Sequence, residues 1–195
     1  WKLIREGRLG TIRVAYAEVN WARIESWHPA PEPFYQVGPL FDVGVYPLTM
    51  LTAMFGPARR VWAYGRVLYP QRVNRQGAPF VIDTPDFIVA AIELASGLLI
   101  RLTTNFYVSR RSSKQDGIEF HGDLGSLYLQ SWHDFNGAVE FAEYNQPLAP
   151  VPLLREPYAG VEWGRGVREM AQAIAEGRPH RATGEHAAHV VEILA

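Results

Sequence analysis

Residues 87–107 read FIVAAIELASGLLIRLTTNFY, and this stretch decides the class of fold. It contains two apolar runs rich in β-branched residues, Phe87 to Leu94 and Leu98 to Tyr107. The short turn Ala95-Ser96-Gly97 separates them. Apolar runs of strand length on either side of a glycine-containing turn indicate two antiparallel strands joined as a hairpin. The stretch therefore predicts part of an antiparallel β-sheet.

More runs of the same kind extend the predicted sheet. Each is short and rich in β-branched or aromatic residues, as strands are, and they are Val61 to Leu68, Gly117 to Gly122, Ser126 to Leu129 and Val139 to Tyr144. The turn Asp123-Leu124-Gly125 joins the second of these to the third. We therefore expect a mostly antiparallel meander of about six strands. A further segment, Thr11 to Val19, is expected to form a strand near the N-terminus.

Helical patterns lie on both sides of this strand-rich region. Val45 to Phe55 places apolar residues at helical spacing and ends at Gly56-Pro57, which is typical of a buried helix. Two more helices are expected at Glu162 to Glu176 and at Thr183 to Ala195. Acidic or capping groups at their starts and Gly177 after the first of them support these ends. The pattern predicts an α+β fold with helices packed on one face of the sheet and the other face open.

The composition excludes several classes of protein. The chain has 195 residues, of which 48% are apolar, and this excludes a disordered protein. It contains no cysteine, so disulfides, thiolate nucleophiles and cysteine-ligated metals are excluded. The net charge of −1, with scattered basic residues, implies no nucleic-acid partner. Charged residues interrupt the apolar runs before the roughly 18–20 residues that a membrane span requires, so we expect no membrane partner.

The N-terminus of this sequence has the pattern of an internal point in a longer protein. Trp1 to Gly7 resembles the last turns of a helix closed by glycine, and no initiator methionine is present. The pattern does not match a signal peptide. We therefore expect a further segment before Trp1.

Three polar residues share one face of the first predicted helix if that helix extends back far enough. Asp42, Tyr46 and Thr49 are four and three residues apart, which is helical spacing. An aspartate beside a tyrosine can transfer protons, because the carboxylate orients a hydroxyl and the phenol gives or takes its proton. Pro47 is compatible with this face only if the helix begins near Gly44 or kinks. In the structural alternative, Asp42 caps the helix and Tyr46 is a half-buried core aromatic.

Residues 20–40 are expected to form a long aromatic loop leading to that face. Four prolines interrupt any regular pattern there, and Trp27, His28 and Tyr35 are among its aromatic residues. An ordered loop of this length within a domain usually serves function. His28 is expected either to contact a polar ligand or to cap backbone carbonyl groups of the loop.

Two other patterns do not support a site. His186 and His189 are three residues apart on the last predicted helix, but no third ligand accompanies them, so we expect no metal. Gly164-Arg165-Gly166 resembles part of a dinucleotide-binding loop. However, no strand immediately precedes it and Glu169 occupies the third glycine position. The pattern therefore fails the structural test for that motif.

The order of several segments resembles one known family. The central segment, Gly38-Pro39-Leu40-Phe41-Asp42-Val43-Gly44-Val45-Tyr46, is similar to the Asp-x-Gly-x-His/Tyr signature of the glucose-fructose oxidoreductase and inositol dehydrogenase (Gfo/Idh/MocA) family. Flanking segments resemble the C-terminal domain of that family, and they are Ile4 to Ile12, Glu93 to Gly97, His121 to Leu127, Glu176 to Arg181 and Gly184 to His189. The resemblance covers essentially the whole chain.

The resemblance implies that residues 1–195 are the C-terminal substrate-binding and oligomerisation domain of a cytoplasmic, two-domain oxidoreductase. Such a parent protein acts on the CH–OH group of a sugar, polyol or related hydroxy compound. It binds NAD or NADP mainly through a Rossmann domain, which would lie before Trp1. The isolated chain is then expected to be inactive and to bind no cofactor alone. A homo-oligomer is expected through the open sheet face.

The resemblance also implies roles for single residues. Asp42 takes the position of an aspartate that contacts a substrate hydroxyl, and Tyr46 takes the position of the catalytic acid–base residue. The residues expected to bind substrate are Trp27, His28, Tyr35 and Thr49. Two departures from the family pattern concern the substrate more than the reaction type. Thr49 stands where inositol-type members often have aspartate, and the glycine run before the signature is reduced to Val37-Gly38.

A second class of function stays open at this point. The same fold could be a non-catalytic module that binds a carbohydrate through the aromatic loop or associates with copies of itself. The discriminating feature is a nucleotide-binding segment before Trp1, which the enzyme needs and the module does not.

Overall fold

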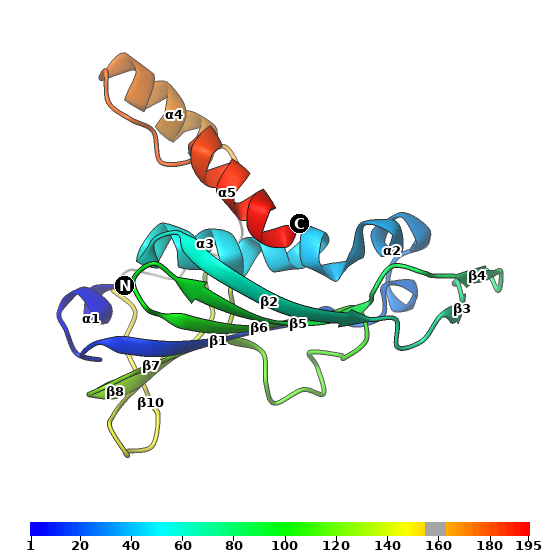
Figure 1. Ribbon diagram of the computed structural model, residues 1–195, viewed down its shortest axis with the longest axis horizontal. Coiled ribbons are helices and arrows are strands. Elements are labelled where there is room, and N and C mark those ends of the chain that lie inside the picture. The colour runs from blue at the N-terminus through cyan, green and yellow to red at the C-terminus, as the bar shows by residue number, and fades with distance from the viewer. Residues whose placement is uncertain (155–162) are drawn as a thin grey trace.

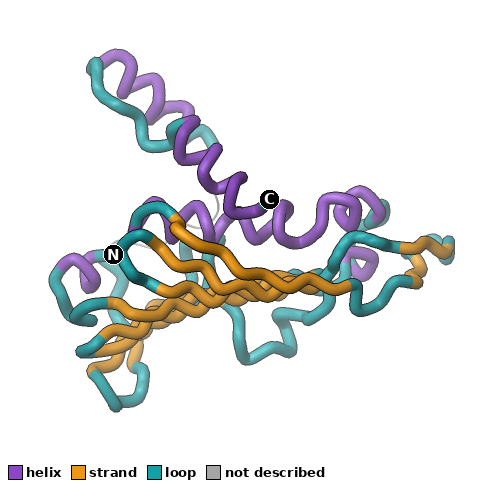
Figure 2. Tube along the Cα trace, viewed as in Figure 1, coloured by secondary structure: helices purple, strands orange, loops and turns teal. Residues whose placement is uncertain are grey.

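The computed structural model describes residues 1–154 and 163–195. In this part of the chain a large sheet forms one layer, the helical stretch at residues 32–55 lies over one of its faces, and the last two helices, at residues 165–175 and 184–194, extend away from that face (Figure 1). Figure 2 shows the same arrangement, with the helices in purple and the strands in orange. The fold is therefore α+β, as the sequence predicts.

The main sheet has eight strands. In spatial order they are β10 (Ala149–Pro150), β9 (Val139–Glu143), β8 (Gly125–Leu129), β7 (Gly117–Gly122), β1 (Ile12–Asn20), β6 (Leu99–Asn105), β5 (Phe87–Leu94) and β2 (Ala58–Arg66). A separate two-stranded ribbon consists of β3 (Gln71–Val73) and β4 (Pro79–Val81). The helical elements are α1 (Lys2–Arg5), the 3-10 helix η1 (Ile24–Ser26), α2 (Glu32–Pro39), the π-helix η2 (Leu40–Gly44), α3 (Val45–Phe55), α4 (Arg165–Ala175) and α5 (Gly184–Leu194).

The sheet differs from the predicted six-stranded meander in two respects. β1 lies between β6 and β7, parallel to the first and antiparallel to the second, so the sheet is mixed although most pairs are antiparallel. β10 also adds a short strand at the edge. The position of β1 could not be predicted, because Ala15 pairs with Ile100, a residue far away in the chain. The expected helix at 162–176 is α4, and its first predicted residue lies outside the described part of the chain.

Alternate residues of the strands form the core under the helices. Successive side chains of a strand point to opposite faces, and in β5 the buried residues are Ile88, Ala90, Ile92 and Leu94. Ile100 and Leu102 continue this face on β6 and have no exposed surface. Leu48 and Leu51 of α3 are buried against the same cluster. The helix at 45–55 predicted from the sequence therefore covers the centre of the sheet (Figure 1).

Two histidines join α5 to the rest of the fold. The Thr183 side chain caps α5 by accepting a hydrogen bond from the backbone N–H of His186, at 3.2 Å. The Nε2 atom of His186 lies 2.8 Å from the Oγ1 atom of Thr52 on α3. The Nε2 atom of His189 accepts a hydrogen bond from the backbone N–H of Ala58, at 2.9 Å. These bonds give both histidines a structural role in holding the C-terminal helix.

The segment 20–40 is not a continuous loop, and that prediction is wrong. It contains η1 and α2, because Pro31 and Pro33 fall at the start of α2, where the missing N–H group is tolerated. Gly38 then adopts a φ of 79° and separates α2 from the turn that follows. A Cβ atom at this position would also make a tight contact of 3.1 Å with Thr84 Cγ2.

Residues 32–55 form a helical stretch that is long and apolar enough, by length and composition alone, to cross a membrane. Gly38 interrupts it, and Val43, Leu48 and Leu51 are buried in the hydrophobic core. Core helices share the composition of membrane spans when they are apolar on most sides. The stretch therefore fits the role of a core helix that rests on the sheet.

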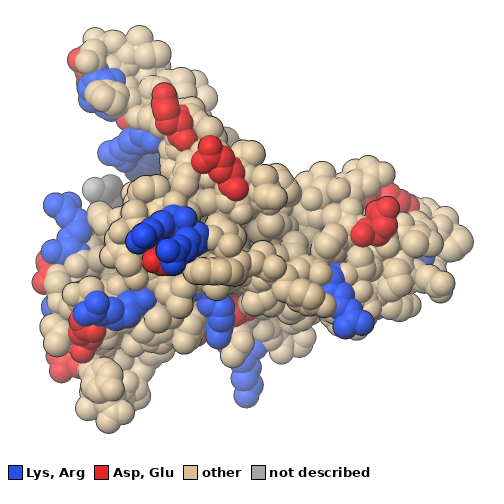
Figure 3. All heavy atoms as spheres, viewed as in Figure 1, with Lys and Arg blue, Asp and Glu red and all other residues tan. Residues whose placement is uncertain are grey.

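Exposed ion pairs occur over much of the surface. Arg13 pairs with Asp123 at 2.9 Å, and Arg178 pairs with Glu169 at 2.7 Å. Acidic and basic side chains lie close to one another on the face seen in Figure 3, in keeping with the net charge of −1. Water screens such pairs, so they contribute little to stability.

One arginine is instead buried in the fold. The side chains of Arg72 on β3 and of Asp86 both have 0% exposed area, and their charged ends form an ion pair. Arg72 Nη1 also lies 2.8 Å from Glu25 Oε1 and donates to the hydroxyl of Tyr35 at 2.7 Å. Glu25 belongs to η1 and Tyr35 to α2. Arg72 therefore ties the segment 20–40 to the ribbon of β3 and β4.

Candidate functional site

The helix that carries the candidate acid–base pair begins before α3. The π-helix η2 precedes α3 directly, and Gly44 at the junction has helical dihedral angles, so the helix continues through the junction. Pro47 lacks the N–H group that would bond to residue 43, and its ring needs extra room there. The wider π turn supplies that room, and such turns are frequent at functional sites. Asp42 therefore lies within the helical segment, one turn before Tyr46.

Tyr46 presents its phenol ring outside the core. Its side chain is 56% exposed, and its ring stacks on Trp132 with a centroid distance of 5.5 Å and an interplanar angle of 18°. Trp132 follows β8 in the chain, so this contact joins α3 to the segment between β8 and β9. The structural alternative of a half-buried core tyrosine does not describe this position, because Tyr46 is more exposed than buried.

Further aromatic rings extend from Trp132 into a continuous cluster. Trp132 contacts Trp21 with a centroid distance of 5.7 Å, and Trp21 contacts Trp27 edge to face at 6.5 Å. His133 lies against both Trp132 and Trp21, at 4.4 Å and 5.5 Å. We call these residues, together with Tyr46, the aromatic cluster.

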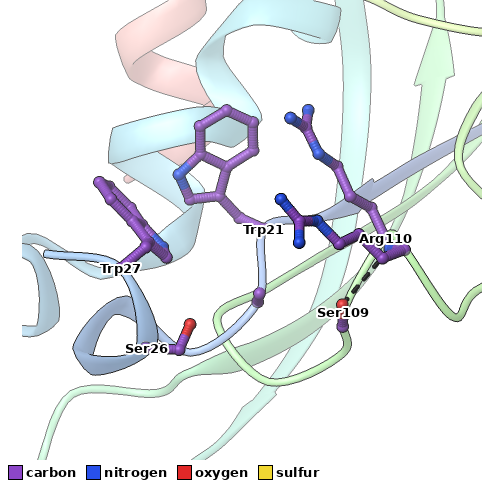
Figure 4. Close-up of a pocket in the computed structure, with 7 residues that line it drawn as sticks. Trp21, Ser26, Trp27, Ser109 and Arg110 are labelled. Atoms are coloured by element: carbon purple, nitrogen blue, oxygen red, sulfur yellow. Dashed lines mark hydrogen bonds between the residues drawn. The ribbon is translucent and has the colours of Figure 1, made fainter.

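A cleft opens beside the aromatic cluster. It encloses about 560 Å³ and is lined by Trp21, Ala22, Ser26, Trp27, Ser109, Arg110 and Arg111. Figure 4 shows Trp21 between Trp27 and Arg110, with Ser26 and Ser109 below them. Aromatic walls with a few polar groups are typical of sites for small ligands. The cleft therefore joins the start of segment 20–40 to the segment between β6 and β7.

Trp27 and His28 have different positions relative to this cleft. Trp27 lines it and is 43% exposed. His28 packs on Trp27 and on Phe34, and its Nδ1 atom lies 2.8 Å from the carbonyl oxygen and 3.1 Å from the backbone nitrogen of Ala30. His28 thus stabilises the turn after η1 and packs against Trp27.

Tyr35 lies in the core and not at the cleft. Only 2% of its surface is exposed, and its hydroxyl donates to Glu25 Oε2 at 2.6 Å. The hydroxyl oxygen of Tyr35 also accepts hydrogen bonds from Arg72 and from the backbone N–H of Ile24. Burial raises the pKa of the Tyr35 hydroxyl. These bonds occupy the hydroxyl, so the structure gives Tyr35 a structural role in place of the expected contact with substrate.

Asp42 and Thr49 flank Tyr46 along the helix. Burial raises the pKa of the Asp42 carboxyl, although the residue keeps part of its surface exposed. The Thr49 hydroxyl donates to the carbonyl of Val45 at 2.7 Å, which leaves its lone pairs available to a ligand. Gly44 lies against the sheet, where a Cβ atom would stand 3.6 Å from Thr104 Cγ2, an ordinary contact distance.

We expect replacement of Asp42 by asparagine to raise the thermal midpoint of this chain at neutral pH. The folded state holds the Asp42 proton more tightly than the unfolded state, because burial raises its pKa. Stability from this group is therefore lost as the pH rises through the folded pKa, and asparagine removes that loss.

The measurement is a melting curve of Asp42→Asn and of the unaltered chain at several pH values. The gain should shrink as the pH falls below the ordinary range of carboxyl pKa values, where both side chains are neutral. The exposed Asp83→Asn is the matched control and should leave the midpoint unchanged. A lower midpoint for Asp42→Asn at neutral pH would show that the carboxylate makes a favourable contact in the fold.

Sequence reasoning missed three residues that the fold brings to this site. Trp132 and His133 follow β8, and Arg110 follows β6, so they lie far from Tyr46 in the chain. The available signal was their composition, since an aromatic–histidine pair and an arginine pair occur in segments between predicted strands. That signal names the segments but does not place them beside the helix.

The described residues do not form a recognisable cofactor or metal site. No group of three or more candidate metal ligands occurs among residues 1–154 and 163–195. In the same part of the chain, β1 and β6 are the parallel pair, and the residues after each strand lack a glycine-rich phosphate loop. What these residues offer is a phenol, a carboxylate and an aromatic cleft.

Solved structures with the same fold are numerous. A UDP-N-acetylglucosamine 3-dehydrogenase, GnnA, from Acidithiobacillus ferrooxidans matches with a TM-score of 0.66 and 15% identity over 99% of this chain and 55% of that chain. An oxidoreductase domain protein from Kribbella flavida matches with a TM-score of 0.68 and 17% identity, over 97% and 56%. An oxidoreductase from Agrobacterium radiobacter, solved with NAD+, L-tartaric acid and magnesium, gives 0.64 and 13%, over 99% and 55%.

These matches show that the chain shares its fold with those proteins, and a family model shows the family to which it belongs. This chain spans about half the length of those solved structures. A search of curated proteins finds no match. The model described as the GFO/IDH/MocA C-terminal domain matches residues 1–128, about two thirds of the chain. The chain therefore belongs to the family of GFO/IDH/MocA C-terminal domains.

Proposed function

We propose that this chain is the substrate-binding half of an NAD(P)-dependent dehydrogenase that acts on a sugar, a polyol or a related hydroxy compound. The observation that carries the proposal is the exposed phenol of Tyr46, one helical turn after Asp42 and stacked at the edge of an aromatic cluster. Membership of the GFO/IDH/MocA family supports an oxidoreductase parent. The named substrate of one structural relative, UDP-N-acetylglucosamine 3-dehydrogenase, supports a sugar.

The residues of this chain fit the substrate side of such a reaction. NAD(P)+, when bound, would accept the hydride from the carbon that bears the reacting hydroxyl. Tyr46 takes the proton of that hydroxyl, helped by a lysine that the family resemblance places before Trp1. Asp42 accepts a hydrogen bond from a substrate hydroxyl and so orients it. The apolar faces of the sugar ring pack on Trp27 and on the other rings that line the cleft.

The main nucleotide site is proposed to lie before Trp1, since the described residues lack a glycine-rich phosphate loop. The test is the intact mass of the native gene product, followed by assays of NAD(P)H formation with a panel of sugars and polyols. A product longer by one domain, about 100–150 residues, that reduces NAD(P)+ with one of these compounds supports the proposal. A product of 22.0 kDa, the mass of this chain, would leave only a binding or assembly role.

We also propose that the chain forms a homo-oligomer through the open face of the sheet. Val61 and Ala63 of β2 pair with Ile92 and Ala90, which face the helices, so the intervening Trp62 points to the opposite face. Trp62 is 53% exposed, and Tyr64 on the same face is 65% exposed. Large exposed aromatic residues on one sheet face are typical of an interface.

Sedimentation of the chain should therefore give a mass above that of a monomer, and Trp62→Glu should shift it toward the monomer. A monomeric unaltered chain over the whole concentration range would contradict this interface. A cytoplasmic location stays a prediction from the sequence.

A further inference from the structure

A group of positive charges lines the aromatic cleft. Arg110 and Arg111 are in the segment between β6 and β7, and both are exposed. They line the aromatic cleft and also a second, polar cleft of about 400 Å³. Lys114 and His133 line the second cleft as well. The two arginines therefore stand where an apolar and a polar cavity meet.

The backbone that carries these arginines is fixed from both sides. The Asn105 side chain donates to Asn20 Oδ1 at 2.8 Å and accepts from the backbone N–H of Val108 at 2.6 Å. Asn105 has no exposed surface. Ala22 N–H donates to the carbonyl of Val108 at 3.0 Å. These bonds hold the start of the segment against the residues that follow β1, which reduces the entropy lost when a ligand binds.

The guanidinium of Arg110 contacts two rings of the aromatic cluster. Its Cζ atom lies 5.1 Å from the centre of the Trp21 ring, and Nη1 lies 3.1 Å from His133 Nε2. An arginine can only donate hydrogen bonds, so His133 Nε2 accepts and carries no proton. Burial and the neighbouring charge of Arg110 lower the pKa of His133, in agreement with this assignment. The remaining N–H groups of Arg110 are directed elsewhere and are available to an acceptor.

The basic residues of this group form no ion pair within the described part of the chain, although two carboxylates, Asp116 and Asp134, also line the polar cleft. Arg110, Arg111 and Lys114 form no ion pair with an aspartate or glutamate there. The Oδ1 atom of Asp116 faces the backbone N–H of Asn20 at 3.5 Å. Burial raises the pKa of the Asp116 carboxyl, and the charge of Arg110 opposes that rise. Three basic and two acidic side chains therefore meet at this cleft, in a chain whose net charge is −1.

We propose that Arg110 and Arg111 form an anion subsite that binds a carboxylate or phosphate group carried by the substrate, with Lys114 at its edge. Planar guanidinium groups bind both kinds of anion through paired hydrogen bonds. The proposal rests on the proposed function, and it narrows the substrate class to acidic or phosphorylated sugars and related hydroxy acids.

The aromatic rings between Arg110 and Tyr46 indicate how such a substrate would be oriented. Arg110 contacts Trp21, Trp21 contacts Trp132, and Trp132 stacks on Tyr46. The anionic group therefore binds at one end of this series, and the hydroxyl that is oxidised lies at the other, beside Tyr46. Interactions far from the reacting carbon orient it in this way in many enzymes.

The test is the affinity of this chain for glucose, glucuronate and glucose 6-phosphate, followed by tryptophan fluorescence. Trp21 and Trp27 line the cleft, so binding there should change the signal. The expected result is tight binding of one or both anionic sugars and weak binding of glucose. Arg110→Gln or Arg111→Gln should weaken binding of the anionic sugar about 10- to 100-fold, the effect of losing a charged hydrogen bond.

Arg59→Gln is the matched control. Arg59 is an exposed arginine near the start of β2, and it lines neither of the two clefts. This variant should leave all affinities unchanged. Stronger binding of glucuronate than of glucose 6-phosphate assigns a carboxylate, and the reverse assigns a phosphate. Equal binding of glucose and both anionic sugars, or equal affinities in the two arginine variants and the unaltered chain, would overturn the subsite.

The anion subsite and the proposed dehydrogenase activity can be tested separately. Arginine-dependent binding of an anionic sugar, without NAD(P)H formation by the longer protein, would support the subsite and contradict the dehydrogenase. NAD(P)H formation with neutral sugars only, at rates that Arg110→Gln leaves unchanged, would support the dehydrogenase and contradict the subsite.

Discussion

Replacement of Tyr46 by phenylalanine is expected to lower the turnover of the proposed dehydrogenase by about 10²- to 10⁴-fold, the usual contribution of a general acid–base group. The change removes only the hydroxyl, and the phenylalanine ring can keep the stacking on Trp132. The fold and the affinity for substrate should therefore change little. The measurement is the steady-state rate of NAD(P)H formation by the longer protein that we propose, before and after the substitution.

Tyr144→Phe is the matched control, because Tyr144 is 75% exposed and follows β9, outside the aromatic cluster. It should leave turnover unchanged. If Tyr46→Phe turns over as fast as the unaltered enzyme, the phenol is not the acid–base group. If turnover and melting temperature fall together, the substitution acts through the fold instead.

Replacement of Arg72 by methionine is expected to destabilise the chain by about 3–5 kcal/mol, because it leaves a buried charge without its partner. Arg72 and Asp86 are both fully buried, and Arg72 also contacts Glu25 and Tyr35. Methionine fills a similar volume but neutralises neither carboxylate. The measurement is urea unfolding of the 195-residue chain, followed by circular dichroism.

The matched control is Arg13→Met, which removes an exposed ion pair with Asp123. It should leave the urea midpoint almost unchanged, since water already screens both charges. A small effect of Arg72→Met would show that the buried network contributes little. In that case the other contacts of segment 20–40, among them its aromatic packing and the hydrogen bond from Asn74 to Glu32, hold it in place.

The predicted strands agree with the structure because their signal is local. β5 and β7 have the predicted ends, and α3 spans the predicted 45–55. Each of the three combines an apolar pattern with a glycine or turn residue at its end, and this pattern can be recognised without knowing which element it packs against. The place of β1 in the sheet is different, because it depends on pairing with β6, which no local pattern reports.

The segment 20–40 shows where composition misleads. Its prolines indicate a loop, but those at the start of α2 occupy positions where a helix tolerates them. Pro47 likewise predicts that the helix either begins near Gly44 or kinks. The structure instead has a π turn before Pro47, and the helix continues through it. In both places the three-dimensional contacts decide between alternatives that the local pattern leaves open.

The candidate site divides in the same way. Asp42 and Tyr46 could be identified because they lie on one short helical segment. Trp132, His133 and Arg110 could not, because they follow two other strands and join the same cluster of contacts only in the folded sheet. The aromatic residues around Tyr35 in the sequence predict that it lies at the site, but in the fold its side chain is buried in the core.

A structure of the longer protein with NAD(P)+ and a bound sugar or polyol would test the central claim most directly. The account predicts that the substrate lies beside the aromatic cluster, with its reacting hydroxyl within about 2.6–3.2 Å of the Tyr46 hydroxyl and its carbon facing the nicotinamide ring. A substrate on the opposite, open face of the sheet, or a nicotinamide ring remote from Tyr46, would contradict it.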